Sequence, residues 1–183
     1  TNAQALKAEL FSADHRHINT ESDSEVLLNV LAHELERTTR GHALSPDEVF
    51  AAVRNVHRRI RGSYAVIALI AGHGLLAFRD PFGIRPLCIG RSADGTVMVA
   101  SESVTLEGTG HMLERNIAPG EAVLIDQDGG CHSQQCAEEA TLNPCIFEYV
   151  YRARPDALID GASVYEARLR MGEKLAEKIR RQH

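Results

Sequence analysis

The chain has 183 residues, of which 44% are hydrophobic and 25% are charged, a composition typical of a folded globular protein rather than a disordered one. The formal net charge of −5 argues against a nucleic-acid-binding surface, and the basic cluster at residues 58–61 is expected to end a helix, where cations are favourable. The longest apolar run, residues 65–72, is far shorter than the roughly 20 residues that cross a bilayer, so we expect no membrane segment.

Four cysteines stand at positions 88, 131, 136 and 145, and their spacing does not resemble a disulfide framework. We therefore expect a reducing, cytoplasmic location. A second interpretation groups Cys131, His132, Cys136 and Cys145 as metal ligands. The C-x4-C spacing is not that of a usual zinc site, and no second close pair exists. A ligand- or metal-binding module without catalytic activity nevertheless stays open as an alternative function.

Helices are predicted in the first third of the chain and at its end. Patterns typical of a capping box, in which a Ser or Thr side chain and an acidic or amide side chain satisfy each other's backbone amides, occur at residues 1–4, 22–25, 45–48 and 163–166. Apolar residues at helical spacing follow each box, and predict helices to about residues 11, 35 and 60. The last box begins a helix that carries Leu169, Leu175 and Ile179 along one side.

The pattern changes to strands after Gly62. Residues 63–70 and 75–79 are predicted to form a hairpin, and further strands are expected at 87–90, 96–100, 122–125 and after 130. Helices followed by antiparallel strands indicate an α+β fold. Residues 72–77 also fit the dinucleotide-binding pattern G-x-G-x-x-A, but that site needs a helix to follow, where a strand is predicted here.

Asp23 is the candidate ligand-binding residue. The ordinary explanation is a carboxylate in the first turn of a helix, which is favourable by ~0.3–1 kcal/mol. However, Ser22 is expected to cap this helix and Glu25 to complete the box, so the carboxylate of Asp23 is not needed for local structure. The alternative is that Asp23 binds the ammonium group of a ligand.

Several segments together resemble class II glutamine amidotransferases. They are H-I-N-T-E-S-D-S-E at 17–25, R-G-S-Y-A at 61–65, F-R-D-P-F-G-I-R-P-L at 78–87, A-S-E-S at 100–103 and A-P-G-E at 118–121. Asparagine synthetases and glucosamine-6-phosphate synthases have related segments and stay alternatives. The segment N-P-C-I-F-E-Y-V-Y-R-A-R-P-D at 143–156, followed by D-G-A-S-V-Y at 160–165, is more specific and resembles the interdomain segment of the amidophosphoribosyltransferase family. Ala157 departs from the serine usual in that family.

The resemblance implies an α+β N-terminal-nucleophile (Ntn) hydrolase fold, an αββα sandwich incomplete at its N-terminus, followed by the start of a phosphoribosyltransferase-type α/β domain. Residues 1–142 would be the later part of the glutaminase domain, residues 143–162 the interdomain linker, and residues 163–183 the first helix of the second domain. No catalytic residue is expected in this chain, because the nucleophile of the family is an N-terminal cysteine that would lie upstream of Thr1.

The activity implied is hydrolysis of glutamine, with transfer of the ammonia to phosphoribosyl pyrophosphate to give 5-phosphoribosylamine in purine biosynthesis. Asp23 would bind glutamine, Mg²⁺ would accompany the phosphoribosyl pyrophosphate, and the enzyme would be a homo-oligomer. One branch of the family ligates an iron–sulfur cluster through a cysteine at the position of Cys145. The sequence around Cys145 is closer to the cluster-free branch, so no metal is predicted there.

Overall fold

The computed structural model describes residues 2–12, 15–39 and 44–182. The chain divides into two compact units, one of residues 1–83 and 118–142 and the other of residues 84–117 and 143–183. The described residues of the first unit form the helices α1 (Ala3–Ser12), α2 (Asp23–Thr38) and α3 (Pro46–Arg59), which confirm the helices predicted there. The capping box predicted at residues 1–4 involves Thr1, which lies outside the described residues.

Helix α3 begins with the complete capping box that the sequence predicts. The Ser45 hydroxyl accepts a hydrogen bond from the Glu48 amide, and the Glu48 carboxylate accepts one from the Ser45 amide at 2.9 Å. Pro46 occupies the first helical position. A backbone N–H at this position has no hydrogen-bond partner within the helix, so the absence of one in proline carries no cost. These local contacts determine the residue at which the helix begins.

The sheet of the first unit has four antiparallel strands in the order β1-β2-β6-β7. The strands are β1 (Ala65–Ile70), β2 (Gly74–Arg79), β6 (Glu121–Asp126) and β7 (Cys131–Gln135). The predicted hairpin of β1 and β2 is confirmed, with Ile70 opposite Gly74 at its turn. Gly74 has φ +144°, and a Cβ atom there would lie 2.1 Å from the carbonyl oxygen of Ile125, so the residue must be glycine.

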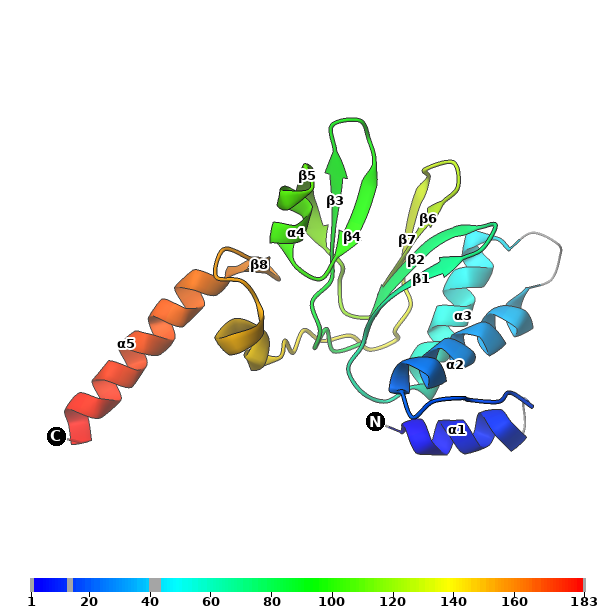
Figure 1. Ribbon diagram of the computed structural model, residues 1–183, viewed down its shortest axis with the longest axis horizontal. Helices are drawn as coiled ribbons and strands as arrows, with labels where there is room; N and C mark the ends of the chain where they lie inside the picture. The colour runs from blue at the N-terminus through cyan, green and yellow to red at the C-terminus, as the bar shows by residue number, and fades with distance from the viewer. Residues whose placement is uncertain (1, 13–14, 40–43, 183) are drawn as a thin grey trace. The chain divides into compact units, whose positions relative to one another are not determined.

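The helices of this unit lie along one side of the sheet (Figure 1) and enclose the main core. Leu76 and Phe78 of β2 and Leu124 of β6 point into this core, where each buried side chain stabilises the fold by roughly 1.5–3 kcal/mol. On the edge strand β1, Ile67 and Leu69 point to the opposite face and are 47% and 79% exposed. The sheet face that packs against the helices is therefore buried, whereas the β1 edge exposes apolar side chains.

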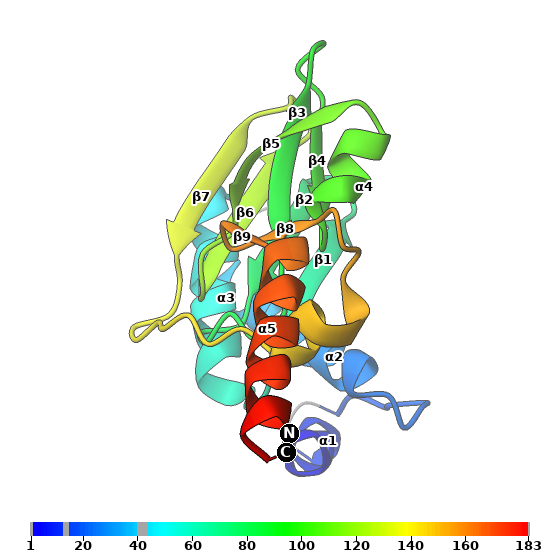
Figure 2. The ribbon, with the colours of Figure 1, turned by 90° about the vertical axis from the view of Figure 1, so that its left-hand side faces the viewer.

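The second unit contains an antiparallel sheet of three strands in the order β4-β3-β5 (Figure 2). The elements are β3 (Cys88–Ser92), β4 (Val97–Ala100), α4 (Ser103–Gly108) and β5 (His111–Asn116). Strands β3 and β4 were predicted, but α4 and β5 were not. Helix α4 has only 6 residues and no side-chain cap, and β5 mixes polar and apolar residues without a regular alternation.

The C-terminal part of the second unit begins with a π-helix, η1 (Glu148–Arg152), where the sequence indicated only an apolar and aromatic segment. It continues through β8 (Leu158–Ile159) and β9 (Ala162–Ser163) into the predicted helix α5 (Val164–Gln182). The Arg168 guanidinium donates to the carbonyl oxygens of Tyr149 at 2.7 Å and Ala153 at 2.8 Å, and so ties α5 to the π-helix. The three apolar side chains predicted along α5 are each about half exposed.

Within the part of the chain that the structure describes, no helix combines the length and the apolar character that crossing a bilayer requires.

Candidate functional site

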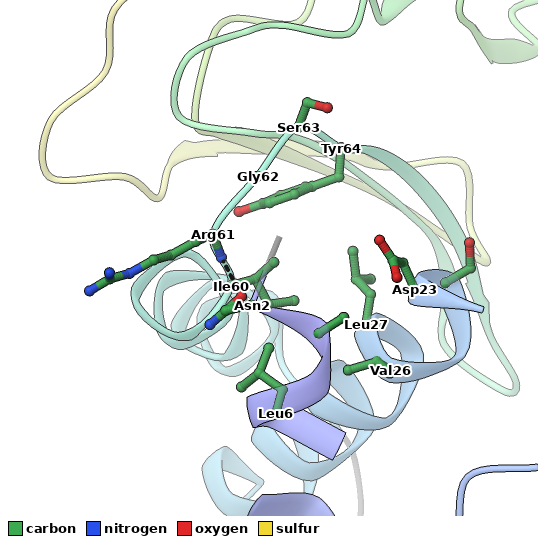
Figure 3. Close-up of a pocket in the computed structure, with 12 residues that line it drawn as sticks. Asn2, Leu6, Asp23, Val26, Leu27, Ile60, Arg61, Gly62, Ser63 and Tyr64 are labelled. Atoms are coloured by element: carbon green, nitrogen blue, oxygen red, sulfur yellow. Dashed lines mark hydrogen bonds between the residues drawn. The ribbon is translucent and has the colours of Figure 1, made fainter. Parts of the chain in front are cut away.

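The first unit contains a cavity of about 120 Å³ where the beginnings of α1 and α2 meet the segment between α3 and β1 (Figure 3). We call residues 60–64 of that segment the wall segment. The apolar part of the lining comes from Leu6, Val26, Leu27, Ile60 and Tyr64, and the polar part includes Asn2, Asp23, Ser24 and Ser63. An apolar pocket with a few polar groups at one side is typical of a site for a small polar molecule with an aliphatic part.

Asp23, singled out from the sequence, lines this cavity. It is the first residue of α2 and is exposed. Figure 3 shows its carboxylate beside the Leu27 side chain, which also lines the cavity. The negative charge stands at a helix N-terminus, so the position is electrostatically favourable even without a ligand. The cavity thus offers a carboxylate that can accept hydrogen bonds from a cationic group.

The capping box predicted at residues 22–25 is half wrong. Ser22 does cap α2, its hydroxyl accepting a hydrogen bond from the Ser24 amide at 3.3 Å. The Glu25 carboxylate, however, accepts from the amides of Asn19 and Thr20, both at 2.8 Å, and from the Thr20 hydroxyl. The Ser22 amide is bonded instead to the Thr20 hydroxyl oxygen. Glu25 therefore holds the loop that leads to the cavity, and the hydrogen bonds from Thr20 and Asn19 lower its pKa.

The wall segment is fixed at its N-terminal end by Asn2. The side-chain amide of Asn2 donates to the Arg59 carbonyl at 2.8 Å, and its oxygen accepts from the Arg61 amide at 2.9 Å. Gly62 follows with φ +139°, a conformation that favours glycine. The Arg61 side chain extends away from Asp23 in Figure 3. No local pattern marks Asn2, because its two partners, Arg59 and Arg61, lie 57 and 59 residues further along the chain.

The wall segment is fixed at its C-terminal end by Tyr64, which is only 8% exposed. The Tyr64 amide donates to the Asp80 carboxylate at 3.3 Å, and the Asp80 amide donates to the Tyr64 carbonyl at 2.9 Å. The phenol oxygen lies 2.7 Å from Nδ1 of His57 on α3. Its ring stacks on that of His57 and meets the ring of Phe78 edge-on, with centroid distances of 5.9 and 6.0 Å.

Both members of the His57–Tyr64 pair are held neutral. Burial lowers the pKa of His57 to about 4, against a smaller opposite effect from the backbone of Gly120. Burial also raises the pKa of Tyr64 above its usual value, and the charge of Asp80 raises it further. At neutral pH the hydrogen bond therefore joins a neutral phenol and a neutral imidazole.

The residues considered as metal ligands do not form a site. Among the residues that the structure describes, no three His, Cys, Asp or Glu side chains gather closely enough to hold a metal ion. Cys131 is exposed, whereas Cys136 is buried, which raises its thiol pKa to about 11. Cys145 is half-buried, and its amide donates to the Ile84 carbonyl at 3.1 Å.

The dinucleotide alternative also finds no support, because residues 71–73 form a tight turn that leads directly into the strand β2. A helix N-terminus, which would hold the pyrophosphate, does not follow the glycines.

Residues 1–108 match the family model described as a glutamine amidotransferase domain. The chain belongs to this glutamine amidotransferase family. The amidophosphoribosyltransferase of Haemophilus influenzae is 55% identical over 182 residues, which cover 98% of this chain and 36% of that relative. The amidophosphoribosyltransferase of Escherichia coli is 53% identical over 186 residues, covering 100% of this chain and 37% of that relative. The chain thus spans little more than a third of the length of these glutamine amidotransferase relatives.

Solved structures agree with this assignment. A glutamine phosphoribosylpyrophosphate amidotransferase from B. subtilis, complexed with ADP and GMP, superimposes with a TM-score of 0.79 at 31% identity. The match covers 96% of this chain and 36% of that chain. A structure described as the allosteric regulatory enzyme of purine biosynthesis gives the same TM-score at 33% identity, over 97% of this chain and 35% of that chain. The predicted α+β fold of the Ntn-type glutamine amidotransferases is confirmed.

Proposed function

We propose that this chain is part of an amidophosphoribosyltransferase. Such an enzyme hydrolyses glutamine and transfers the ammonia to phosphoribosyl pyrophosphate, which gives 5-phosphoribosylamine in the first committed step of purine synthesis. The observation that carries the proposal is similarity to amidophosphoribosyltransferases along essentially the whole chain, including the interdomain segment at 143–156. We further propose a cytoplasmic homo-oligomer, with residues 1–142 in the glutaminase domain, 143–162 in a linker and 163–183 in the first helix of the transferase domain.

The cavity beside Asp23 is proposed to bind the amino-acid end of glutamine. Asp23 would accept charge-assisted hydrogen bonds from the α-ammonium group, which distinguishes free glutamine from a glutamine side chain in a protein. The apolar lining would contact the methylene groups. The nucleophile, a cysteine thiolate that forms a thioester with glutamine as ammonia leaves, would come from a part of the enzyme outside these residues. The contribution of this chain is therefore to bind and orient the substrate.

The function is tested by assaying the full-length enzyme for glutamine-dependent formation of 5-phosphoribosylamine from phosphoribosyl pyrophosphate. Glutamine-dependent formation of asparagine or of glucosamine 6-phosphate would contradict the proposal. Formation of phosphoribosylamine from free ammonia but not from glutamine would contradict the glutamine-hydrolysing part of the proposal, and with it the role given to the cavity.

A polypeptide of residues 1–183 alone is expected to release no ammonia from glutamine and to be only marginally stable. No side chain in it replaces an N-terminal cysteine with its own α-amine as base. The exposed Ile67 and Leu69 at the β1 edge, and the apolar side of α5, would face water and favour aggregation. Ammonia release and thermal unfolding of the purified polypeptide measure both effects. Glutamine turnover, or a sharp two-state transition of a monomer, would contradict the respective half of the prediction.

We propose that Cys145 holds no iron–sulfur cluster, since the segment around it resembles the cluster-free branch more closely. Mg²⁺ is proposed to accompany phosphoribosyl pyrophosphate, with ligands outside this chain. Full-length protein purified without oxygen is expected to contain neither iron nor acid-labile sulfide. Stoichiometric amounts of both, lost when Cys145 is changed to serine, would contradict the expectation.

A further inference from the structure

The wall segment is the part of the proposed glutamine site whose position depends most on contacts outside the cavity. Asn2 fixes its beginning, and Tyr64 fixes its end through three independent contacts, to Asp80, Phe78 and His57. The contact with Asp80 holds only the Tyr64 backbone, and Phe78 contacts only the ring. His57 is thus the residue in this set that fixes the phenol end of the ring.

His57 does not line the cavity itself. It projects from the last turn of α3 and borders a different cavity of about 220 Å³, together with Arg54 and Cys136. Tyr64 does line the cavity, and Figure 3 shows its ring across the cavity from Leu6, with Asp23 to one side. The hydrogen bond and the ring contact with Tyr64 are therefore a direct route by which His57 can affect a ligand in the cavity.

We propose that His57 is a positioning residue for glutamine binding, which holds the Tyr64 ring as a fixed wall of the cavity through the hydrogen bond between Nδ1 and the phenol. This inference rests on the proposed function of the cavity. The phenol oxygen lies 2.7 Å from Nδ1 of His57, so the polar end of the ring is bonded to α3. The ring face, in contrast, can pack on the methylene groups of glutamine while Asp23 binds the ammonium group. Without the hydrogen bond the Tyr64 ring can tilt. Glutamine binding must then immobilise the ring, and the free energy that this costs weakens the binding.

The test measures the KM and kcat for glutamine in the full-length enzyme with Tyr64→Phe, His57→Leu and both changes together. Each single change is expected to raise the glutamine KM about fivefold, the value of one net hydrogen bond, without lowering kcat. The double variant is expected to match the single variants, because all three lack the same bond. His57→Gln keeps a side chain that can donate or accept a hydrogen bond with the phenol, and it is expected to restore a KM close to that of the unchanged enzyme. The matched control is His132→Gln, a partly exposed histidine of β7, which should leave KM unchanged.

Three results would overturn the proposal. They are an unchanged glutamine KM in Tyr64→Phe, effects of the two single changes that multiply in the double variant, and an equal loss when free ammonia replaces glutamine. The last result would indicate a general structural role of His57, since the ammonia-dependent reaction does not use the glutamine cavity. An unchanged enzyme that releases no ammonia from glutamine would instead refute the proposed function itself, and this outcome is visible before any variant is made.

Discussion

Replacing Asp23 with alanine in the full-length enzyme is expected to raise the KM for glutamine about 30- to 150-fold. The carboxylate lines the cavity at the start of α2, where it is the acidic group of the lining. When glutamine fills the cavity, its ammonium group loses water and needs a partner of opposite charge. Removing one partner of such a pair costs about 2–3 kcal/mol, which corresponds to this change in KM.

Asp47→Ala is the matched control for this experiment. Asp47 also lies in the first turn of a helix that a serine caps, but it does not line the cavity. Its replacement removes the same favourable interaction with a helix N-terminus, worth ~0.3–1 kcal/mol, and should leave the glutamine KM unchanged. The reaction driven by free ammonia should proceed normally in both variants. A normal KM and kcat for glutamine in Asp23→Ala would exclude the proposed role.

Replacing Glu34 with alanine is expected to destabilise the fold by about 3–5 kcal/mol. Glu34 lies in α2 and is only 1% exposed, and its carboxylate accepts hydrogen bonds from Arg59 at 2.6 Å and Asn55 at 3.0 Å. Arg59 in turn reaches Glu9 of α1 at 3.0 Å, so the network connects all three helices of the first unit. Loss of Glu34 leaves the largely buried guanidinium without its closest charge partner. Thermal and denaturant unfolding of the full-length enzyme measure the effect.

Glu36→Ala is the control for Glu34. Glu36 lies in the same helix and pairs with Arg16 at 2.7 Å, but its side chain is 74% exposed. A pair so open to solvent contributes only about 0–1 kcal/mol. An equal loss of unfolding free energy in Glu34→Ala and Glu36→Ala would contradict the larger contribution assigned to the buried network.

Local signals predicted most of the secondary structure. The box at Ser45 and Glu48 places the start of α3 correctly, because its hydrogen bonds join residues three apart. The hairpin of β1 and β2 follows from its glycine turn in the same way. The pairing of β2 with β6 has no such signal, because Phe78 and Ala122 come together only through the fold. The short helix α4 and the π-helix were missed because each has too few residues to establish a period. The strand β5 was missed because its polar and apolar residues do not alternate regularly.

The candidate site was predictable only where a motif marked it. Asp23 was singled out as a carboxylate not needed to cap its helix, the resemblance to glutamine amidotransferases then implied glutamine as its ligand, and in the structure it lines a cavity. Asn2 and His57 were not found, since each acts on the wall segment through contacts that the chain order does not reveal. Glu25 was assigned to the wrong partner because the box pattern does not show that the Thr20 hydroxyl already occupies the Ser22 amide.

The separate roles of Glu25 and Asp23 affect how the short segment S-D-S-E should be used to annotate genomes. Glu25 is bonded to the loop at Asn19 and Thr20, so selection for folding alone is enough to retain it. Asp23, on the proposed function, is retained only while glutamine is a substrate. A descendant that had lost glutaminase activity would therefore keep Ser22 and Glu25, while position 23 would accumulate substitutions. On the proposed function, Asp23 rather than the segment as a whole is therefore the position that distinguishes lineages with glutaminase activity from lineages that have lost it.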